Sequence, residues 1–191
     1  MKNNNEELFD DTLSKKHKKK TIKKEIFSWL SLIVIAFAIA FFINNVIIVN
    51  ATVPTGSMRN TIQENSRIVA FRLAYLFSEP SRNDVIAFRF PDDPSILYIK
   101  RIIGLPGERI EIINGQVFIN HSSVPLYEDY LFEPPVGHNM IFYVPPYSYF
   151  VLGDDRNNSH DSRFWANSFV FYSDILGRAL FSYFPRIGLI R

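Results

Sequence analysis

The chain has 191 residues and no cysteine, a length that fits one folded domain and one appendage. Without cysteine, disulfide frameworks, cysteine nucleophiles and cysteine-ligated zinc are excluded. Of the 21 basic and 19 acidic residues, residues 1–25 hold eight lysines and five acids, which leaves 13 basic and 14 acidic residues, or −1, for the remainder. The net charge of +2 therefore belongs to the N-terminal tail and does not indicate nucleic-acid binding by the folded part.

The first predicted element is a transmembrane anchor over residues 26–49. Residues 26–43 are apolar and uncharged apart from Ser28 and Ser31, and the apolar run resumes after two asparagines. At a rise of 1.5 Å per residue, about 18 to 24 residues reach roughly 27–36 Å, which matches the hydrocarbon core of a bilayer. A buried core helix would not carry a lysine cluster beside it. A cleavable secretory signal would have a shorter apolar run, followed by its small-residue cleavage site.

The flanking charges predict how this anchor is oriented. The lysines of residues 15–24 precede the apolar run, and no comparable cluster follows it. The positive-inside rule therefore places the N-terminus in the cytoplasm. The sequence predicts a cytoplasmic basic tail over residues 1–25, the anchor over 26–49 and an extracytoplasmic domain over 50–191.

The remainder of the chain reads as short strands separated by turn residues. Runs rich in β-branched and aromatic residues occupy residues 47–53, 67–71, 85–90, 96–103, 109–113, 116–119, 149–152, 170–175 and 178–183. Asn114-Gly115, between two of them, is a strong hairpin signal. Residues 121–147 contain five prolines and are expected to be loops. Many short strands with such punctuation predict a mainly β domain with an antiparallel, barrel-like sheet.

The first residue that points to chemistry is Ser57. Pro54 restricts its own φ, and Gly56 permits a close backbone approach, so this turn can present the hydroxyl and the N–H of Ser57 outward. The segment is not the Gly-x-Ser-x-Gly elbow of α/β hydrolases, because Thr55 and Arg59 occupy the glycine positions. A serine after glycine is also common in ordinary turns, so Ser57 alone does not establish catalysis.

Lys100 is the only lysine beyond residue 24, whereas the same region has twelve arginines. Strand alternation places Lys100 on the face of Tyr98 and Ile102, and Arg101 on the opposite face. An apolar face lowers a lysine pKa by desolvation, and the charge of Arg101 is expected to lower it further. A neutral amine near Ser57 would act as its general base. The alternative is a surface lysine that extends its charged end into water.

The polar loop over residues 153–163 allows three interpretations. The many oxygen atoms of the loop would suit a calcium site. However, the positively charged Arg156 lies among them, and the loop lacks the glutamate that completes a calcium-binding loop. His160 and Asp161 could complete a Ser-His-Asp triad. In the third interpretation the loop is a structural corner, in which Asp161 pairs with Arg163 and Ser159 offers its hydroxyl to the Lys100 amine.

Several segments together resemble the bacterial type I signal peptidases. They are Pro-Thr-Gly-Ser-Met at residues 54–58, Ile-Lys-Arg-Ile-Ile-Gly-Leu-Pro-Gly-Glu at 99–108 and Gly-Asp-Asp-Arg-Asn-Asn-Ser-His-Asp-Ser-Arg at 153–163, with further likeness at 83–88 and 186–188. The likeness spans residues 53–188. It implies a membrane-anchored serine endopeptidase with an antiparallel β fold and a Ser/Lys dyad, which removes signal peptides from exported proteins and needs no metal or organic cofactor.

The resemblance also implies roles for individual residues. Ser57 would be the nucleophile and Lys100 the general base, with an oxyanion hole made by the Ser57 N–H and the Thr55 hydroxyl. Three loop residues would support the base: Ser159 would orient the Lys100 amine, and Asp161 with Arg163 would buttress the loop. The substrate would bind as an extended strand with small residues in shallow apolar pockets, whose expected wall residues are Val53, Met58, Tyr98 and Ile99.

The sequence departs from the family pattern at a few positions. Arg59-Asn60 stands where a residue and then a proline usually follow the methionine, Asp155 stands at a common asparagine, and Ala166 stands where glycine often follows tryptophan. None of these positions carries a proposed catalytic atom.

The expected partners are signal peptides of exported preproteins and membrane lipid, without nucleic acid, for a monomer in the bacterial plasma membrane. Two other functions remain open. One is a catalytically inactive, membrane-tethered binding protein on the same fold, which loss of Ser57 or Lys100 would reveal. The other is a self-cleaving Ser/Lys protease, which would require a DNA-binding module and a soluble chain.

Overall fold

The computed structural model describes residues 24–191. The chain divides into two units, one ending at Ile43 and one spanning Asn44–Arg191. The predicted cytoplasmic tail, residues 1–25, lies outside the described residues except for its last two positions.

The N-terminal apolar segment forms one helix, Lys24–Ile47. Its last turn, Ile43–Ile47, is the π-helix η1. The helix has the length and composition to cross a membrane, and its most apolar window is not buried within the described residues. This exposure argues against a core helix of a soluble domain. The helix ends two residues before the predicted end of the anchor at residue 49, and Val49 is 5% exposed and packs in the core of the second unit.

The second unit is built almost entirely of antiparallel strands. Their bounds are β1 Ile48–Val53, β2 Ser66–Phe71, β3 Val85–Phe90, β4 Asp93–Gly104, β5 Arg109–Ile113, β6 Gln116–Ile119, β7 Met140–Tyr143, β8 Ser148–Leu152, β9 Val170–Phe171, β10 Ile175–Phe184 and β11 Gly188–Leu189. Four short 3-10 helices connect them: η2 Gly56–Met58, η3 Arg72–Tyr75, η4 Arg156–Asn158 and η5 Tyr172–Asp174.

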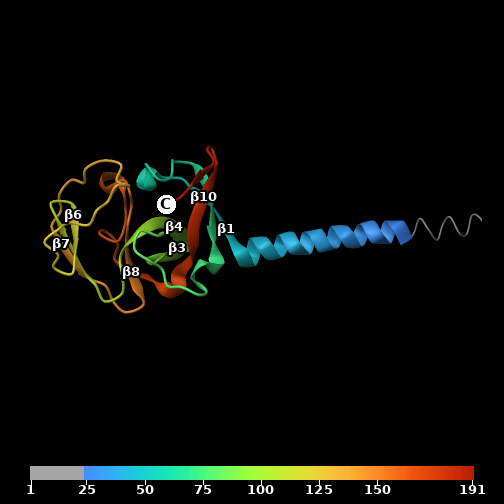
Figure 1. Ribbon diagram of the computed structural model, residues 1–191, viewed down its shortest axis with the longest axis horizontal. Helices are drawn as coiled ribbons and strands as arrows, with labels where there is room; N and C mark the ends of the chain where they lie inside the picture. The colour runs from blue at the N-terminus through green and yellow to red at the C-terminus, as the bar shows by residue number, and fades with distance from the viewer. Residues whose placement is uncertain (1–23) are drawn as a thin grey trace, which may run out of the picture. The chain divides into compact units, whose positions relative to one another are not determined.

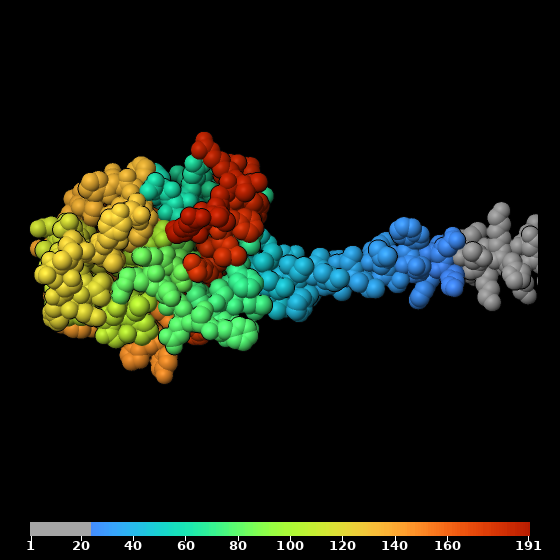
Figure 2. All heavy atoms as spheres, viewed as in Figure 1, coloured from blue at the N-terminus to red at the C-terminus, as the bar shows by residue number. Residues whose placement is uncertain are grey.

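The strands form two sheets. The large sheet has the order β1-β2-β10-β3-β4-β8-β9, with β11 paired to β10, and the small sheet has the order β6-β5-β7 (Figure 1). Residues of the small sheet, yellow in Figure 2, gather at one end of this unit. The predicted mainly β, antiparallel domain is confirmed. Among the described strands no pairing joins β1 to β9, so the large sheet is not closed into a complete barrel.

Apolar residues pack on both faces of β3 and β4. Val85, Ala87 and Ile99 belong to one core cluster, whereas Ile86 and Ile102 belong to another. These central strands are therefore buried on both sides, and a polar side chain in them must find a partner inside the protein.

Two sequence predictions about elements need correction. The proline-rich stretch 121–147 was expected to be loop, but Met140–Tyr143 pairs with β5 as strand β7. The predicted strand 170–175 is interrupted by η5, so that only Val170–Phe171 pairs with β8, and Ile175 already begins β10.

Candidate active site

Ser57 and Lys100 meet inside the second unit. Ser57 lies in η2, Lys100 lies in β4 opposite Ile86, and a hydrogen bond of 2.5 Å joins Lys100 Nζ to Ser57 Oγ. The two residues are 5% and 4% exposed. The predicted pairing of a serine with the only lysine beyond residue 24 is thus present in the geometry.

Burial lowers the pKa of Lys100 to about 8. The positive charge of Arg163 acts in the same direction, whereas the carboxylates of Asp161 and Asp154 raise the pKa. An amine with this pKa is partly neutral near neutral pH, as a general base must be.

The expected contribution of Arg101 to this pKa is not found. Its side chain is 1% exposed and forms two hydrogen bonds with the buried Asp154, Nε to Oδ1 at 2.8 Å and Nη2 to Oδ2 at 2.6 Å. The adjacent carboxylate offsets its positive charge. The cation that lowers the Lys100 pKa is Arg163 instead, which lies in the polar loop and not on β4.

The backbone of the polar loop holds the nucleophile turn. The Asp155 N–H donates to the Ser57 carbonyl at 3.1 Å. A Cβ on Gly153 would come within 2.5 Å of that same carbonyl oxygen and within 2.3 Å of Ser159 Oγ. Only glycine permits this approach, so residue 153 fixes how closely the loop packs on Ser57.

The Thr55 hydroxyl lies next to the nucleophile. Its Oγ1 donates to Ser57 Oγ at 3.3 Å, and the residue is exposed at the cavity. A hydroxyl at this place is close enough to reach an oxygen that develops charge beside Ser57 Oγ.

Asp161 and Arg163 form the predicted structural corner. Arg163 donates from Nε to Oδ1 at 2.8 Å and from Nη2 to Oδ2 at 2.9 Å, and the Gly153 N–H also donates to Asp161 Oδ2. This corner occupies the Asp161 carboxylate, so the carboxylate does not orient His160. The His160 ring contacts Phe90 and Trp165 instead, and a Ser-His-Asp triad is not assembled.

The calcium-loop interpretation also conflicts with these contacts. Its principal carboxylates, Asp154 and Asp161, are held in ion pairs by Arg101 and Arg163. Within residues 24–191 no group of three histidine or carboxylate side chains is arranged to hold a metal ion.

Ser159 is the predicted site residue whose contact differs from expectation. It lines the same cavity as Lys100, but its Oγ is buried without a hydrogen-bond partner among residues 24–191. The expected hydrogen bond from Ser159 to the lysine amine is therefore not formed. The hydroxyl packs against Gly153.

A cavity of about 510 Å³ opens over the dyad. Its walls are the end of β1 with the segment that follows it, strand β4, and part of the polar loop with Phe164. The predicted wall residues Val53, Tyr98 and Ile99 line it. Met58 does not line it, because its side chain is 0% exposed in the core.

Sequence reasoning missed several lining residues. They are Thr52, Pro54, Ile96, Leu97, Asn157, Asn158 and Phe164. His160 also lines the cavity, but it had been considered only as a member of a triad. Ile96 and Leu97 lie in the same apolar run as the predicted Tyr98 and Ile99, so the run as a whole was the available signal. No local pattern indicated that Phe164 reaches the cavity.

The model of the family described as "Signal peptidase, peptidase S26" matches residues 26–184. The chain belongs to this family. It is 34% identical over 163 residues to the probable signal peptidase I-1 of Synechocystis sp., covering 82% of this chain and 81% of the relative. It is 39% identical over 145 residues to signal peptidase I of Leptolyngbya laminosa, covering 71% and 70%.

A solved structure is also similar. The crystal structure of a signal peptidase I from Enterococcus faecalis V583 is 34% identical, with a TM-score of 0.46, and the match covers 53% of this chain and 97% of that chain. As a member of the signal peptidase family, the protein is a serine peptidase that removes signal peptides. The resemblance inferred from the sequence motifs is confirmed at the level of the family.

Proposed function

We propose that this signal peptidase cleaves preproteins with Ser57 as nucleophile and Lys100 as its general base. The observation that carries the proposal is the 2.5 Å contact between Lys100 Nζ and Ser57 Oγ, in a site where both side chains are almost fully buried. The lowered pKa of Lys100, about 8, supports the same roles.

The reaction follows from these groups. The neutral Lys100 amine takes the proton of Ser57, and the Ser57 oxygen attacks the scissile carbonyl carbon. The Ser57 N–H and the Thr55 hydroxyl donate to the oxyanion. Lys100 then gives its proton to the leaving amine, and the same amine activates the water that hydrolyses the acyl-enzyme. Asp161 and Arg163 hold the loop that packs on this site.

We further propose that the substrates are signal peptides of exported preproteins, bound extended between the end of β1 and β4. The walls Val53, Tyr98 and Ile99 favour small apolar side chains. One chain supplies both dyad residues, so a monomer is sufficient for catalysis. No metal, organic cofactor or nucleic acid takes part in this mechanism.

The inactive binding protein and the self-cleaving protease are less well supported. An inactive binding protein would gain nothing from a buried lysine in contact with a serine. Burial disfavours the charged amine, as the lowered pKa of Lys100 indicates, and therefore costs folding stability. The second does not explain the apolar helix Lys24–Ile47.

The decisive experiment is cleavage of a purified preprotein in the presence of lipid. The wild-type enzyme should release one product that begins at the end of the signal peptide, as read by mass spectrometry. Lys100→Met, which keeps the length of the side chain and removes the amine, should release none. Equal cleavage by both proteins would overturn the proposed dyad.

Membrane orientation can be tested separately. We propose that the helix anchors the enzyme with residues 1–25 in the cytoplasm, because the cluster Lys15–Lys24 is costly to translocate. Protease added to intact spheroplasts should therefore degrade the region after Val49 and spare the tail. Digestion of the tail instead would reverse the topology and place Ser57 in the cytoplasm, where exported proteins have not yet crossed.

A further inference from the structure

Arg59 lies directly against the turn that carries the nucleophile. A Cβ on Gly56 would come within 2.7 Å of Arg59 Nη2 and 3.2 Å of Arg59 Cζ, so the guanidinium covers the residue before Ser57. On another side it packs over the ring of Phe132, with Cζ 5.2 Å from the ring centroid. The Arg59 side chain is 42% exposed, so water still reaches it.

The partner of Arg59 is Asp155. Arg59 Nη1 lies 3.8 Å from Asp155 Oδ2, and the Asp155 side chain is 2% exposed. Its other oxygen, Oδ1, has no hydrogen-bond partner among residues 24–191. The backbone N–H of the same residue holds the Ser57 carbonyl at 3.1 Å. A buried carboxylate is thus fixed beside the nucleophile turn with one cation to balance it.

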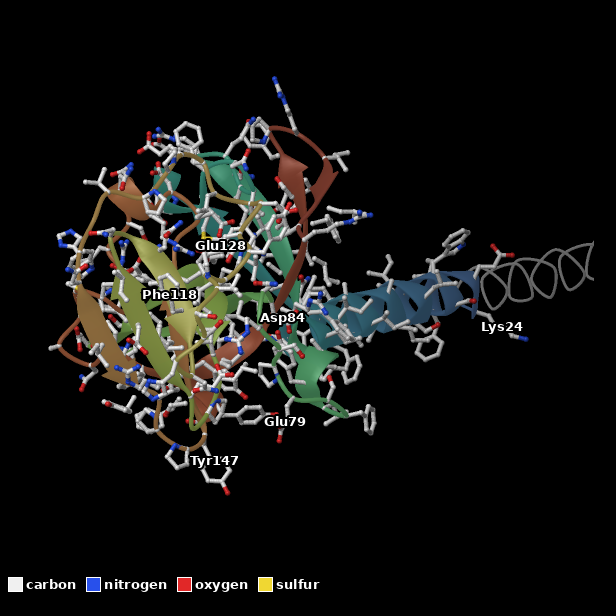
Figure 3. The ribbon with its side chains drawn as sticks, turned by 60° about the vertical axis from the view of Figure 1, so that its left-hand side comes forward. Lys24, Glu79, Asp84, Phe118, Glu128 and Tyr147 are labelled. Carbon is white, nitrogen blue, oxygen red and sulfur yellow. The ribbon has the colours of Figure 1, made fainter. Side chains whose placement is uncertain are left out.

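The other charges around the dyad are already paired. Three arginine–carboxylate pairs are involved: Arg101 with Asp154, Arg163 with Asp161, and Arg156 with Glu128, which is labelled in Figure 3. Each of these arginines is at most 5% exposed and engaged by its own carboxylate. Arg59 is therefore the cation that lies beside the Asp155 carboxylate.

We infer that Arg59 is a positioning residue for the reaction, acting through Asp155 on the Ser57 turn. The inference rests on the proposed role of Ser57. Without Arg59, the buried Asp155 carboxylate would be uncompensated in the residue whose N–H bonds the Ser57 carbonyl. The negative charge of Asp155 would then disfavour the oxyanion. The Asp155 segment would also shift toward water, which would weaken the hydrogen bond from its N–H to the Ser57 carbonyl.

We expect an asymmetric double-mutant cycle. Arg59→Ala should lower kcat about tenfold and leave KM within about twofold, because the transition state and not substrate binding is affected. Asp155→Asn should stay within about twofold of wild type, because the half-exposed Arg59 remains solvated when its partner loses its charge. The double variant Arg59→Ala/Asp155→Asn should regain most of the activity, since no buried charge is left unpaired. Arg59→Lys, which keeps the charge, should also be active.

Arg178→Ala is the matched control. Arg178 is 49% exposed and pairs at 3.1 Å with the buried Asp84, which is labelled in Figure 3, but it does not contact the Ser57 turn. Arg178→Ala should leave kcat unchanged, although it also leaves a buried carboxylate without its arginine. The thermal midpoint of each variant, measured alongside, shows that the assayed protein is folded.

Two results would overturn the inference: wild-type kcat in Arg59→Ala, or a double variant no more active than Arg59→Ala. Ser57→Ala, assayed in parallel, separates this failure from that of the proposed function. An active Ser57→Ala would reject the dyad itself. An inactive Ser57→Ala beside a fully active Arg59→Ala would reject only the role of Arg59.

Discussion

Replacing Ser57 or Lys100 by alanine is expected to lower preprotein cleavage by about 10⁴-fold or more, as for other catalytic units of nucleophile and base. Each substitution removes one half of the pair that is joined at 2.5 Å. Lys100→Arg should be as inactive as Lys100→Ala, because a guanidinium does not release its proton near neutral pH. The measurement is kcat/KM with a purified preprotein, accompanied by a thermal midpoint for each variant.

His160→Ala is the control for these substitutions. His160 lines the cavity, but its ring contacts Phe90 and Trp165 and not the nucleophile. It should therefore retain catalysis. Activity that survives in Lys100→Ala and disappears in His160→Ala would replace the lysine base by a histidine.

Thr55→Val is expected to lower kcat by about 10²- to 10³-fold, the usual cost of removing one oxyanion-hole donor. Valine keeps the shape of threonine and removes the hydroxyl, which lies 3.3 Å from Ser57 Oγ. Thr55→Ser keeps a hydroxyl at the same place and should remain within about tenfold of wild type. Single-turnover rates with the same preprotein separate this effect from binding. A Thr55→Val enzyme with the kcat of wild type would assign the second oxyanion donor to another group.

The strands could be predicted from the sequence because their signals are local, whereas the dyad was inferred from the single lysine beyond residue 24 and from the family resemblance. Alternating β-branched residues predicted β3 as Val85–Phe90, and the Asn-Gly pair predicted the hairpin of β5 and β6. The position of Lys100 on the face of Tyr98 followed from strand alternation. The strand β7 was missed because its four residues follow a proline-rich stretch, and only pairing with β5 makes them a strand.

The errors at the site concern contacts between segments distant in sequence. Met58 was expected in the pocket wall, but packing with the rest of the core buries it completely. The charge of Arg101 is offset by Asp154, which lies 53 positions away. The pairing of Arg59 with Asp155 joins two positions that looked like unrelated departures from the family pattern. Alternation and turn signals carry no information on such contacts.

The pH dependence of kcat/KM tests the central claim most directly, because it reports the base in the free enzyme. Burial lowers the pKa of Lys100 to about 8, and only the neutral amine can accept the Ser57 proton, so the rate should rise with pH and level off above that value. The account predicts one limb centred near pH 8, identical in wild type and His160→Ala. A limb centred near about 6.5, the ordinary histidine value, and abolished in His160→Ala would contradict it.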